Sequence, residues 1–116
     1  MTEQDPDCIF CKIAAGEIPA DIVHQDHWTV AFRDLNPKAP THVLVNPRRH
    51  VPSVADLTDE DGELLAAMFG TIRAVAEQAG LSSYRVASNV GPDAGQSVFH
   101  LHLHLLGGRS MSWPPG

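Results

Sequence analysis

The sequence lacks several features that would place it in a specialised class. No apolar run approaches the roughly 20 residues that a helix needs to cross a bilayer, and the acidic start MTEQDPD is unlike a secretory signal. Basic residues are few: 8 lysines and arginines stand against 14 aspartates and glutamates, so the formal net charge is −6. This balance argues against a nucleic-acid partner, although a local pocket can still bind one nucleotide. We therefore expect a cytoplasmic protein with no membrane segment.

Internal repeats, low-complexity tracts and linker-like stretches are also lacking. The chain has 116 residues, of which 43% are hydrophobic. This length suits one core and is short for two, and the apolar content argues against disorder. We therefore expect a single domain over residues 1–116.

Hydrophobic periodicity predicts two helices and five strands. A short helix over 9–15 is stopped by Gly16. A long helix begins at Thr58, which can cap it, and is stopped by Gly80. The apolar stripe of the long helix is predicted to include Leu64, Leu65, Met68, Phe69, Ile72, Val75, Ala76 and Ala79. Strands are predicted over 22–25, 28–33, 42–46, 84–89 and 99–106. Short turns and one long helix predict an α+β fold with a five-stranded antiparallel sheet.

Near the end of the chain, three histidines alternate with three leucines, in the order His100, Leu101, His102, Leu103, His104, Leu105. In an extended strand the imidazoles share one face, roughly 7 Å apart, and the leucines share the other. A straight strand makes a catalytic metal site of all three histidines awkward. We therefore expect a division of labour in which His102 is a nucleophile and the outer histidines support it. A structural metal site or a solvated strand remains the alternative.

A glycine-containing loop over 90–96 precedes this segment. Its small residues would let backbone N–H groups approach a phosphate closely. Ser97 could donate a hydrogen bond to a leaving group, and Asn89 could contact a ribose or hold the loop. An ordinary connection between two strands would use the same residues.

The two cysteines, Cys8 and Cys11, are three positions apart. In a reducing cytosol this spacing indicates a metal or redox site rather than a disulfide. His50 and His100 would complete a tetrahedral Cys₂His₂ set for a structural zinc ion. The spacing is not that of a zinc finger, so a redox dithiol and two unliganded cysteines remain open.

Several motifs together resemble the histidine triad (HIT) family of nucleotide-binding hydrolases and transferases. They are HLHLHLL over 100–106, the flanking GQSV and GGR, the stretch DLNPKAPTH over 34–42 and PRRH over 47–50. The ending WPPG resembles the Hint branch, whose members hydrolyse purine nucleoside phosphoramidates. The resemblance covers the chain from about Cys8 to the last residue.

The resemblance implies a role for each matching residue. His102 matches the nucleophile, His104 and His42 match the other histidines at the phosphate, and Ser97 matches the residue near the leaving group. The other implied nucleotide contacts are Asp34, Leu35, Asn89, Gly95 and Gln96. Relatives with C-x-x-C carry a structural zinc, and its ligands match Cys8, Cys11, His50 and His100.

The resemblance also implies an HIT-like fold and a homodimer in which two sheets join into one. The implied reaction is hydrolysis of the P–N bond of a purine nucleoside 5′-phosphoramidate through a nucleotidyl-histidine, with no cofactor in the chemistry. The expected ligands are the phosphoramidate and the nucleoside monophosphate. Candidates for the wall of an apolar base pocket are Ile9, Phe10, Ile18, Ile22 and Phe32. The alternatives are a dinucleoside polyphosphate hydrolase, a non-enzymatic nucleotide-binding scaffold and a metallohydrolase.

Overall fold

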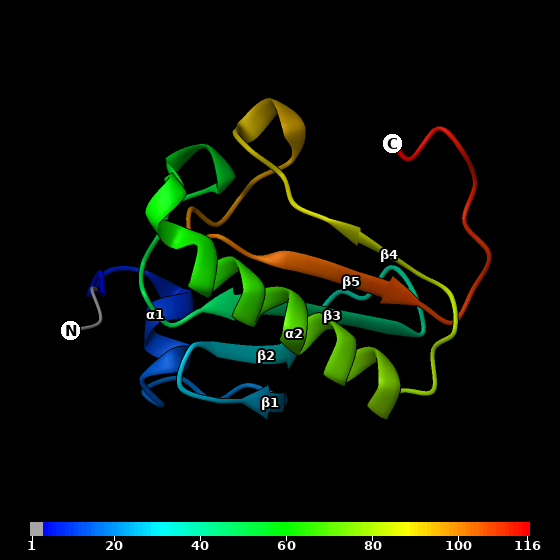
Figure 1. Cartoon of the computed structure of the whole chain (residues 1–116), viewed down its shortest axis with the longest axis horizontal. Coiled ribbons are helices and arrows are strands. Elements are labelled where there is room, and N and C mark those ends of the chain that lie inside the picture. Colours follow the sequence, from blue (N-terminus) through cyan, green and yellow to red (C-terminus); the bar gives the residue numbers. More distant parts are fainter. Residues whose placement is uncertain (1–3) are drawn as a thin grey trace.

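Five strands form one antiparallel sheet in the order β1-β2-β3-β5-β4, as the computed structural model of residues 4–116 shows (Figure 1). The strands are β1 (Ile22–Gln25), β2 (Thr29–Arg33), β3 (Thr41–Pro47), β4 (Tyr84–Ala87) and β5 (Leu103–Gly107). The predicted α+β fold and its five strands are confirmed. The strand that carries the last histidine, β5, lies between β3 and β4 rather than at an edge.

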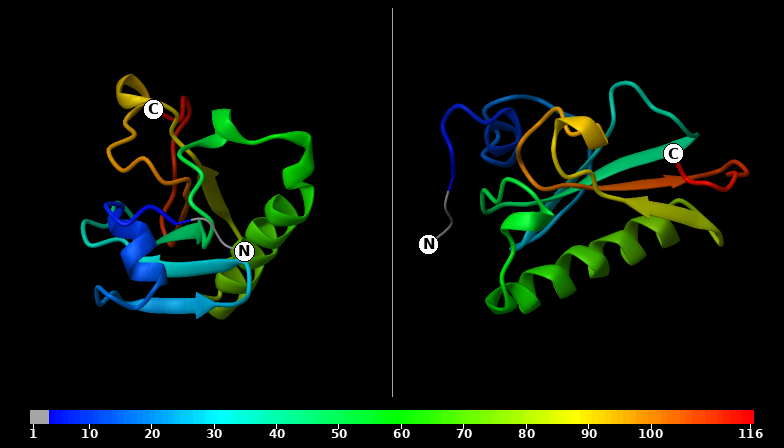
Figure 2. Two further views of the ribbon diagram at one scale, coloured as in Figure 1. Left: turned by 90° about the vertical axis from the view of Figure 1, so that its left-hand side faces the viewer. Right: turned by 90° about the horizontal axis from the view of Figure 1, so that it is seen from above.

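The two helices lie on opposite faces of the sheet. Figure 2 shows α2 (Gly62–Gln78) along one face, and α1 (Ile9–Ala14) on the other together with the 3₁₀ turn η3 (Pro92–Ala94). Each face therefore has its own core. The core under α2 contains the three leucines that alternate with the histidines, and a second core under α1 is centred on Phe10 and Phe32.

The long helix begins as the sequence predicts, although its first turn is 3₁₀ (η2, Asp59–Asp61). Thr58 Oγ1 accepts the Glu60 N–H at 3.2 Å, and Asp61 Oδ2 accepts the Thr58 N–H at 2.8 Å, so a capping box satisfies the free donors. After the helix, Gly80 has φ +70° and reverses the chain. Two residues of the predicted stripe are wrong. Phe69 is 44% exposed, because it lies about 100° around the helix from the buried Met68. Ala79 is exposed as well, because it is the C-cap and lies just past the last helical residue.

The last strand is shorter than predicted, since β5 begins at Leu103 and not at residue 99. In its register with β3, Leu101 would face Pro47, which has no N–H to donate. The Pro47 carbonyl instead accepts from the His100 ring at 2.8 Å, and the Leu101 N–H donates to Val51 O. The alternation persists in side-chain burial, because Leu101, Leu103 and Leu105 all remain in the core. The strand predicted over 84–89 similarly ends at Ala87.

Candidate functional site

A pocket of about 300 Å³ opens beside α1 and is large enough for a small ligand. Apolar side chains from α1, β2 and β3 form much of its wall. Among the residues that line it are Ile9, Phe10, Ile13, Ile18, Phe32, Leu44, Val98, Asp34, Leu35, Gly95, Ser97, His102 and His104. Four of the five residues predicted for the wall of a base pocket therefore line this pocket. The prediction for Ile22 is wrong, because it lies on the edge strand β1, one strand further out than Phe32.

The His102 ring has one tautomer that its surroundings allow. Its Nδ1 lies 2.7 Å from the His100 carbonyl oxygen, which can only accept, so Nδ1 carries the proton. The Nε2 atom therefore keeps its lone pair. Burial lowers the pKa of His102, which favours the neutral ring at pH 7. The side chain is half-buried and lines the pocket, so a neutral nucleophilic nitrogen is available there.

His42 and His104 form a second chain of hydrogen bonds. The Lys38 backbone N–H donates to His42 Nδ1 at 3.0 Å, so the proton of His42 is on Nε2. That Nε2 lies 3.0 Å from His104 Nδ1, which must accept. His104 consequently carries its proton on Nε2, a buried atom that has no partner among the described residues. Burial above all, and then the neighbouring histidines, lower the pKa of His104 to about 4. The site thus presents a neutral donor that lacks an acceptor.

The turn after β2 holds Asp34 and Leu35 at the pocket. Asp34 Oδ1 accepts the Asn36 N–H at 2.8 Å, while Oδ2 lies 3.4 Å from His42 Nε2. Leu35 is 98% exposed and contributes to the pocket wall. A carboxylate beside an exposed apolar side chain suits the hydroxyls of a sugar and the face of a base.

The Gln96 side chain holds the loop before the histidines in place through hydrogen bonds. This buried side chain accepts the Gly91 N–H at 2.9 Å and donates to Pro52 O at 2.7 Å and to Val98 O at 3.2 Å. A nucleotide contact by Gln96 stays a prediction, since its amide is engaged within the protein. The exposed Ser97, which follows it, lines the pocket.

Asn89 and His42 lie outside the wall of this pocket. They line an adjacent hollow that shares Asp34 and His104 with the pocket. The Asn89 amide also comes within 3.5 Å of where a Cβ on Gly95 would lie, and Gly95 has φ +95°. The positive φ favours a glycine at this turn, and Asn89 lies next to it.

Four side chains from three separate parts of the chain converge into a cage. It consists of Cys8, Cys11, His50 and His100, whose candidate ligand atoms all lie within 4.8 Å of one another. His100 Nδ1 is 3.3 Å from Cys8 Sγ and 3.5 Å from Cys11 Sγ, and His50 Nδ1 is 3.4 Å from Cys11 Sγ. A tetrahedral zinc ion with its usual bond lengths would hold sulfur and nitrogen ligands about 3.5 Å apart. The cage therefore fits zinc.

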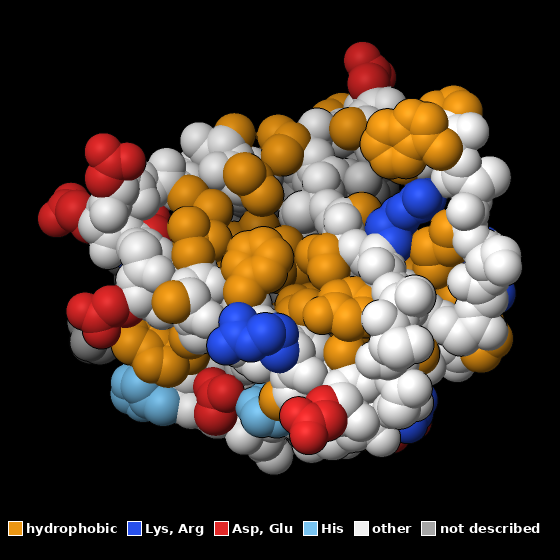
Figure 3. All heavy atoms as spheres, turned by 45° about the vertical axis from the view of Figure 1, so that its right-hand side comes forward, with side chains coloured by type: hydrophobic (Ala, Val, Ile, Leu, Met, Phe, Trp, Pro, Cys, Tyr) orange, Lys and Arg blue, Asp and Glu red, His pale blue; other side chains and the backbone are white. Residues whose placement is uncertain are grey.

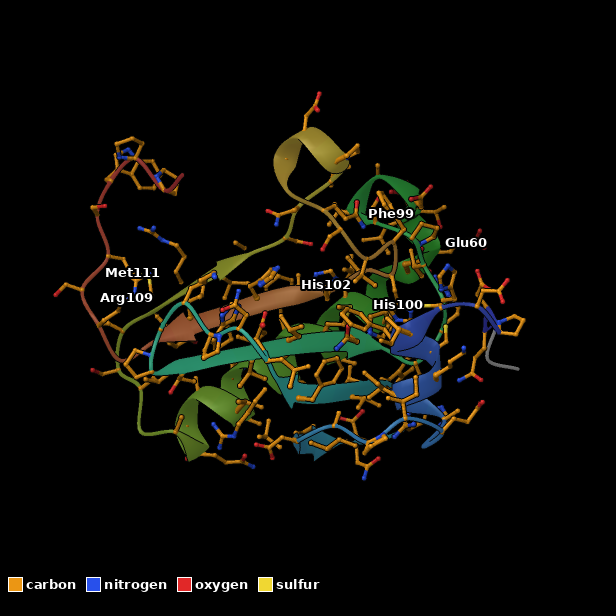
Figure 4. The ribbon with its side chains drawn as sticks, turned by 180° about the vertical axis from the view of Figure 1, so that it is seen from behind. Glu60, Phe99, His100, His102, Arg109 and Met111 are labelled. Carbon is orange, nitrogen blue, oxygen red and sulfur yellow. The ribbon has the colours of Figure 1, made fainter. Side chains whose placement is uncertain are left out.

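The proton positions in the cage leave His100 ready to bind a metal ion, whereas Cys11 must first lose its proton. His100 donates its Nε2–H to Pro47 O, so Nδ1 faces the sulfurs with a lone pair. Burial lowers the pKa of His100 to about 4 and raises that of the Cys11 thiol to about 11. Figure 4 shows His100 beside α1, with His102 further along toward β5. His100 thus lies in the cage and His102 lines the pocket, and the division of labour between them stays a prediction.

Sequence reasoning missed two supporting groups. One is the Lys38 backbone N–H on His42, which leaves no signal in the residue types. The other is Arg49, which pairs at 2.6 Å with the buried Asp61 and joins the His50 segment to the start of α2. Hydrogen bonds from Thr58 and Arg49 lower the pKa of Asp61. The juxtaposition of PRRH with an acidic helix start could have indicated this pair.

Comparisons with known proteins agree with the geometry. Residues 7–113 match the family model described as scavenger mRNA decapping enzyme C-term binding. An uncharacterized HIT-like protein of Synechococcus elongatus is 50% identical over 111 residues, which are 95% of this chain and 97% of that protein. A 14 kDa zinc-binding protein of Zea mays is 45% identical over 115 residues, which are 97% and 90% of the two chains. In the part of the chain that the structure describes, no helix is long and apolar enough to cross a bilayer.

Solved structures extend the match to three dimensions. A HIT family hydrolase from Legionella pneumophila superposes with a TM-score of 0.93 at 51% identity, covering 95% of this chain and all (100%) of the other. A histidine triad protein from Clostridium difficile gives a TM-score of 0.90 at 42% identity, covering 94% and 96%. With these relatives, its sheet and its alternating histidines, the chain belongs to the histidine triad (HIT) family.

Proposed function

We propose that this protein hydrolyses the P–N bond of purine nucleoside 5′-phosphoramidates through a nucleotidyl group carried on His102. The observation that carries the proposal is the bond from His102 Nδ1–H to the His100 carbonyl, which leaves the Nε2 lone pair at a nucleotide-sized pocket. The Legionella pneumophila relative is named a hydrolase, which supports hydrolysis as the reaction class.

In the first step, His102 Nε2 attacks the α-phosphorus and the P–N bond breaks. The electron pair of that bond passes to the leaving nitrogen, which takes a proton that Ser97 relays from solvent. The new nucleotidyl-imidazolium is stabilised by its Nδ1–H bond to the His100 carbonyl. In the second step, water attacks the phosphorus, the phosphorus–nitrogen bond to His102 breaks, and a proton is released. Two smaller barriers then replace one large barrier.

His104 supplies the donor for the charge that develops on the phosphoryl oxygens. Its Nε2–H is fixed by the chain from Lys38 through His42 and needs no reorganisation during the reaction. Backbone N–H groups of the loop around Gly95 would approach the same oxygens. Asp34 would accept from the ribose, and the apolar wall would hold the base.

Zinc in the cage would have a structural role, since all four ligands come from the protein and close the site. The zinc-binding relative in Zea mays supports this assignment. A catalytic metal at Asp34, His42 and His104 is disfavoured, although their ligand atoms lie within 4.8 Å of one another. The Lys38 N–H occupies His42 Nδ1, so His42 Nε2 is protonated and cannot serve as a neutral metal ligand.

A homodimer is part of the proposal. Strand β4 pairs only with β5 among the described strands, which leaves its other edge open for a second sheet. Hydrophobic side chains gather on the face formed by α2, β4 and the C-terminal tail (Figure 3). Phe69, Tyr84 and Trp113 are 44%, 41% and 81% exposed in the single chain. Light scattering coupled to size-exclusion chromatography should give twice the chain mass.

The deciding experiment uses an adenosine 5′-phosphoramidate as substrate. Rapid quench in alkaline denaturant, which preserves the acid-labile phosphorus–nitrogen bond, followed by intact-mass spectrometry at non-acidic pH should detect protein heavier by one adenylyl group, and His102→Ala should abolish both this species and turnover. The variant should still bind AMP, because the remaining wall of the pocket is intact. Substantial turnover by His102→Ala would defeat the mechanism, and AMP binding without turnover by the native chain would favour a scaffold.

A specific observation supports a second candidate, hydrolysis of dinucleoside polyphosphates. The adjacent hollow contains Lys38, Arg85 and Arg109 beside His104, so it offers positive charge for further phosphates. Arg85 and Arg109 already donate to backbone carbonyls at 2.9–3.0 Å, which limits that role. Relative kcat/KM for diadenosine polyphosphate and for the phosphoramidate discriminates between the two functions.

A further inference from the structure

Phe10 lies between the two cysteines of the cage and touches the proposed nucleophile. We propose that Phe10 is a positioning residue for His102 and that the cage residues position Phe10, so that metal binding and nucleotide binding strengthen each other. This inference rests on the proposed function, because it assigns His102 as the nucleophile.

The cage restrains the orientation of α1. The helix has only six residues, too few to be stable alone. Cys8 is its N-cap and accepts the Cys11 N–H on Sγ at 3.4 Å, while Cys11 Sγ accepts the Asp5 N–H at 3.4 Å. Both sulfurs also face His100. A metal ion bound by these sulfurs would fix the helix to the sheet at both ends of the C-I-F-C turn.

The C-I-F-C turn places the Phe10 ring against His102. Phe10 is 8% exposed, and its ring makes a T-shaped contact with His102 at 5.2 Å between centroids and 80° between planes. It makes similar contacts with Phe32 at 5.3 Å and with His100 at 6.0 Å. A displacement of the turn would therefore move a group packed directly on the His102 ring.

Two of the contacts that hold the His102 ring come from residues of the cage or between its ligands, and a third comes from the His104 ring at 5.0 Å between centroids. The His100 carbonyl fixes the Nδ1 proton, and the His100 ring is itself a cage ligand. Phe10 packs against the His102 ring and is separated from each cysteine ligand by no more than one residue. Release of the cage would thus loosen both the proton position and the ring orientation of His102.

The same turn forms part of the nucleotide pocket. Ile9, Phe10 and Ile13 all come from α1, and all line the pocket. Because coupling between two ligands is reciprocal, a bound nucleotide must raise the affinity of the cage for zinc by the factor with which zinc raises nucleotide affinity. The cage then contributes to the affinity and geometry of the site as well as to the stability of the fold.

The first test compares Phe10→Leu with Phe32→Leu in the zinc-loaded protein. Both variants lose one ring from the same apolar core and the same pocket wall, but of the two rings only Phe10 contacts His102. Histidine ¹⁵N NMR should show His102 protonated at Nδ1 in the native chain and a mixture of tautomers in Phe10→Leu. For Phe10→Leu, kcat should fall on the order of 10- to 100-fold. Phe32→Leu should weaken AMP binding and change the His102 ¹⁵N shifts less than Phe10→Leu does, because Phe32 reaches His102 only through Phe10.

The second test measures the coupling itself. Calorimetry should show AMP binding on the order of tenfold weaker in zinc-free protein whose far-UV circular dichroism is unchanged. Competition with a chromophoric chelator should show that saturating AMP raises zinc affinity by the same factor. Equal AMP affinity in the two forms, or native His102 shifts and native kcat in Phe10→Leu, overturns the inference.

Each outcome is informative. If the zinc-free chain unfolds, the comparison of Phe10→Leu with Phe32→Leu decides alone, because both variants are measured with zinc bound. Failure of the proposed function is recognised separately: a native chain that binds AMP and shows the expected His102 tautomer but hydrolyses no phosphoramidate defeats that function. The NMR and calorimetric results then still report on the positioning of His102.

Discussion

Replacement of His42 by phenylalanine tests the proton arrangement at the site most directly. His42 is 6% exposed and joins the Lys38 N–H to His104 through two contacts of 3.0 Å. Phenylalanine keeps the ring but has neither an acceptor nor a donor. In this variant, His104 Nδ1 no longer accepts a hydrogen bond from residue 42. The proton of the His104 ring can then move from Nε2 to Nδ1. In the other tautomer, a lone pair rather than an N–H would face the phosphoryl oxygen.

The size of the effect follows from the loss of one preorganised donor. Removal of such a donor lowers kcat by about 10²–10³-fold, or about 2.7–4 kcal/mol, and this is an upper bound because His104 can still sample the donating tautomer. The Lys38 N–H also loses its acceptor, which should lower the free energy of unfolding by about 1–3 kcal/mol. Steady-state kinetics with an adenosine phosphoramidate and chemical denaturation measure the two quantities independently.

His42→Gln is the matched control. Its amide carries one acceptor and one donor, so it can take the Lys38 N–H and donate to His104, and it should recover part of the lost kcat. Histidine ¹⁵N shifts should report the His104 proton on Nε2 in the native chain and in His42→Gln. A native kcat for His42→Phe, or equal losses for the two variants, would refute the assignment of a donor tautomer to His104.

Four further predictions concern pH, metal and backbone. Burial lowers the pKa of His102, and that of His104 to about 4, so kcat should keep its neutral-pH value at pH 6.5, where an ordinary histidine is half protonated, and fall at lower pH; a loss near pH 7 would contradict this. The His100 pKa is lowered from 6.5 to about 4, and the unfolded chain therefore binds more protons in this interval. The metal-free protein should lose stability as pH falls from 6.5 to 4, measured by denaturant melts. Zinc must displace the proton of Cys11, whose pKa is about 11, so its affinity in chelator competition should rise about tenfold per pH unit for that thiol near neutrality. Gly108→Ala should lower Tm, at a cost of about 1–3 kcal/mol, because Gly108 has φ +91° and a Cβ would lie 2.9 Å from Pro40; Gly62→Ala, in open space, should not.

The fold could be predicted from the sequence because its local signals agree with its packing. The Thr58 cap, the Gly80 stop and the alternation of leucine with histidine each fix an element, and the tertiary structure keeps all three. The strand ends could not be predicted, since they depend on which residue lies opposite. The start of β5 is set by Pro47, a residue more than 50 positions away in the sequence.

The candidate site likewise combines features that the sequence predicts with features that it does not. Residue types and a family resemblance were enough to propose the cage, and the distances among its ligand atoms agree with it. The proton positions could not be predicted, because they depend on backbone groups such as the His100 carbonyl and the Lys38 N–H. The contact between Phe10 and His102 was equally hidden, since it joins a helix to a segment about 90 residues away.

The strict alternation from His100 to Leu105 also limits how this segment can change. The three leucine side chains lie in the core under α2. The three histidine side chains lie on the other face, where His100 is part of the cage and His102 and His104 line the pocket. Insertion or deletion of a single residue here would exchange the two sets, placing imidazoles among apolar side chains and leucines at the cage and the pocket. The segment can therefore tolerate substitutions at some positions. Its length is fixed, because the alternation supplies side chains to both faces of the sheet.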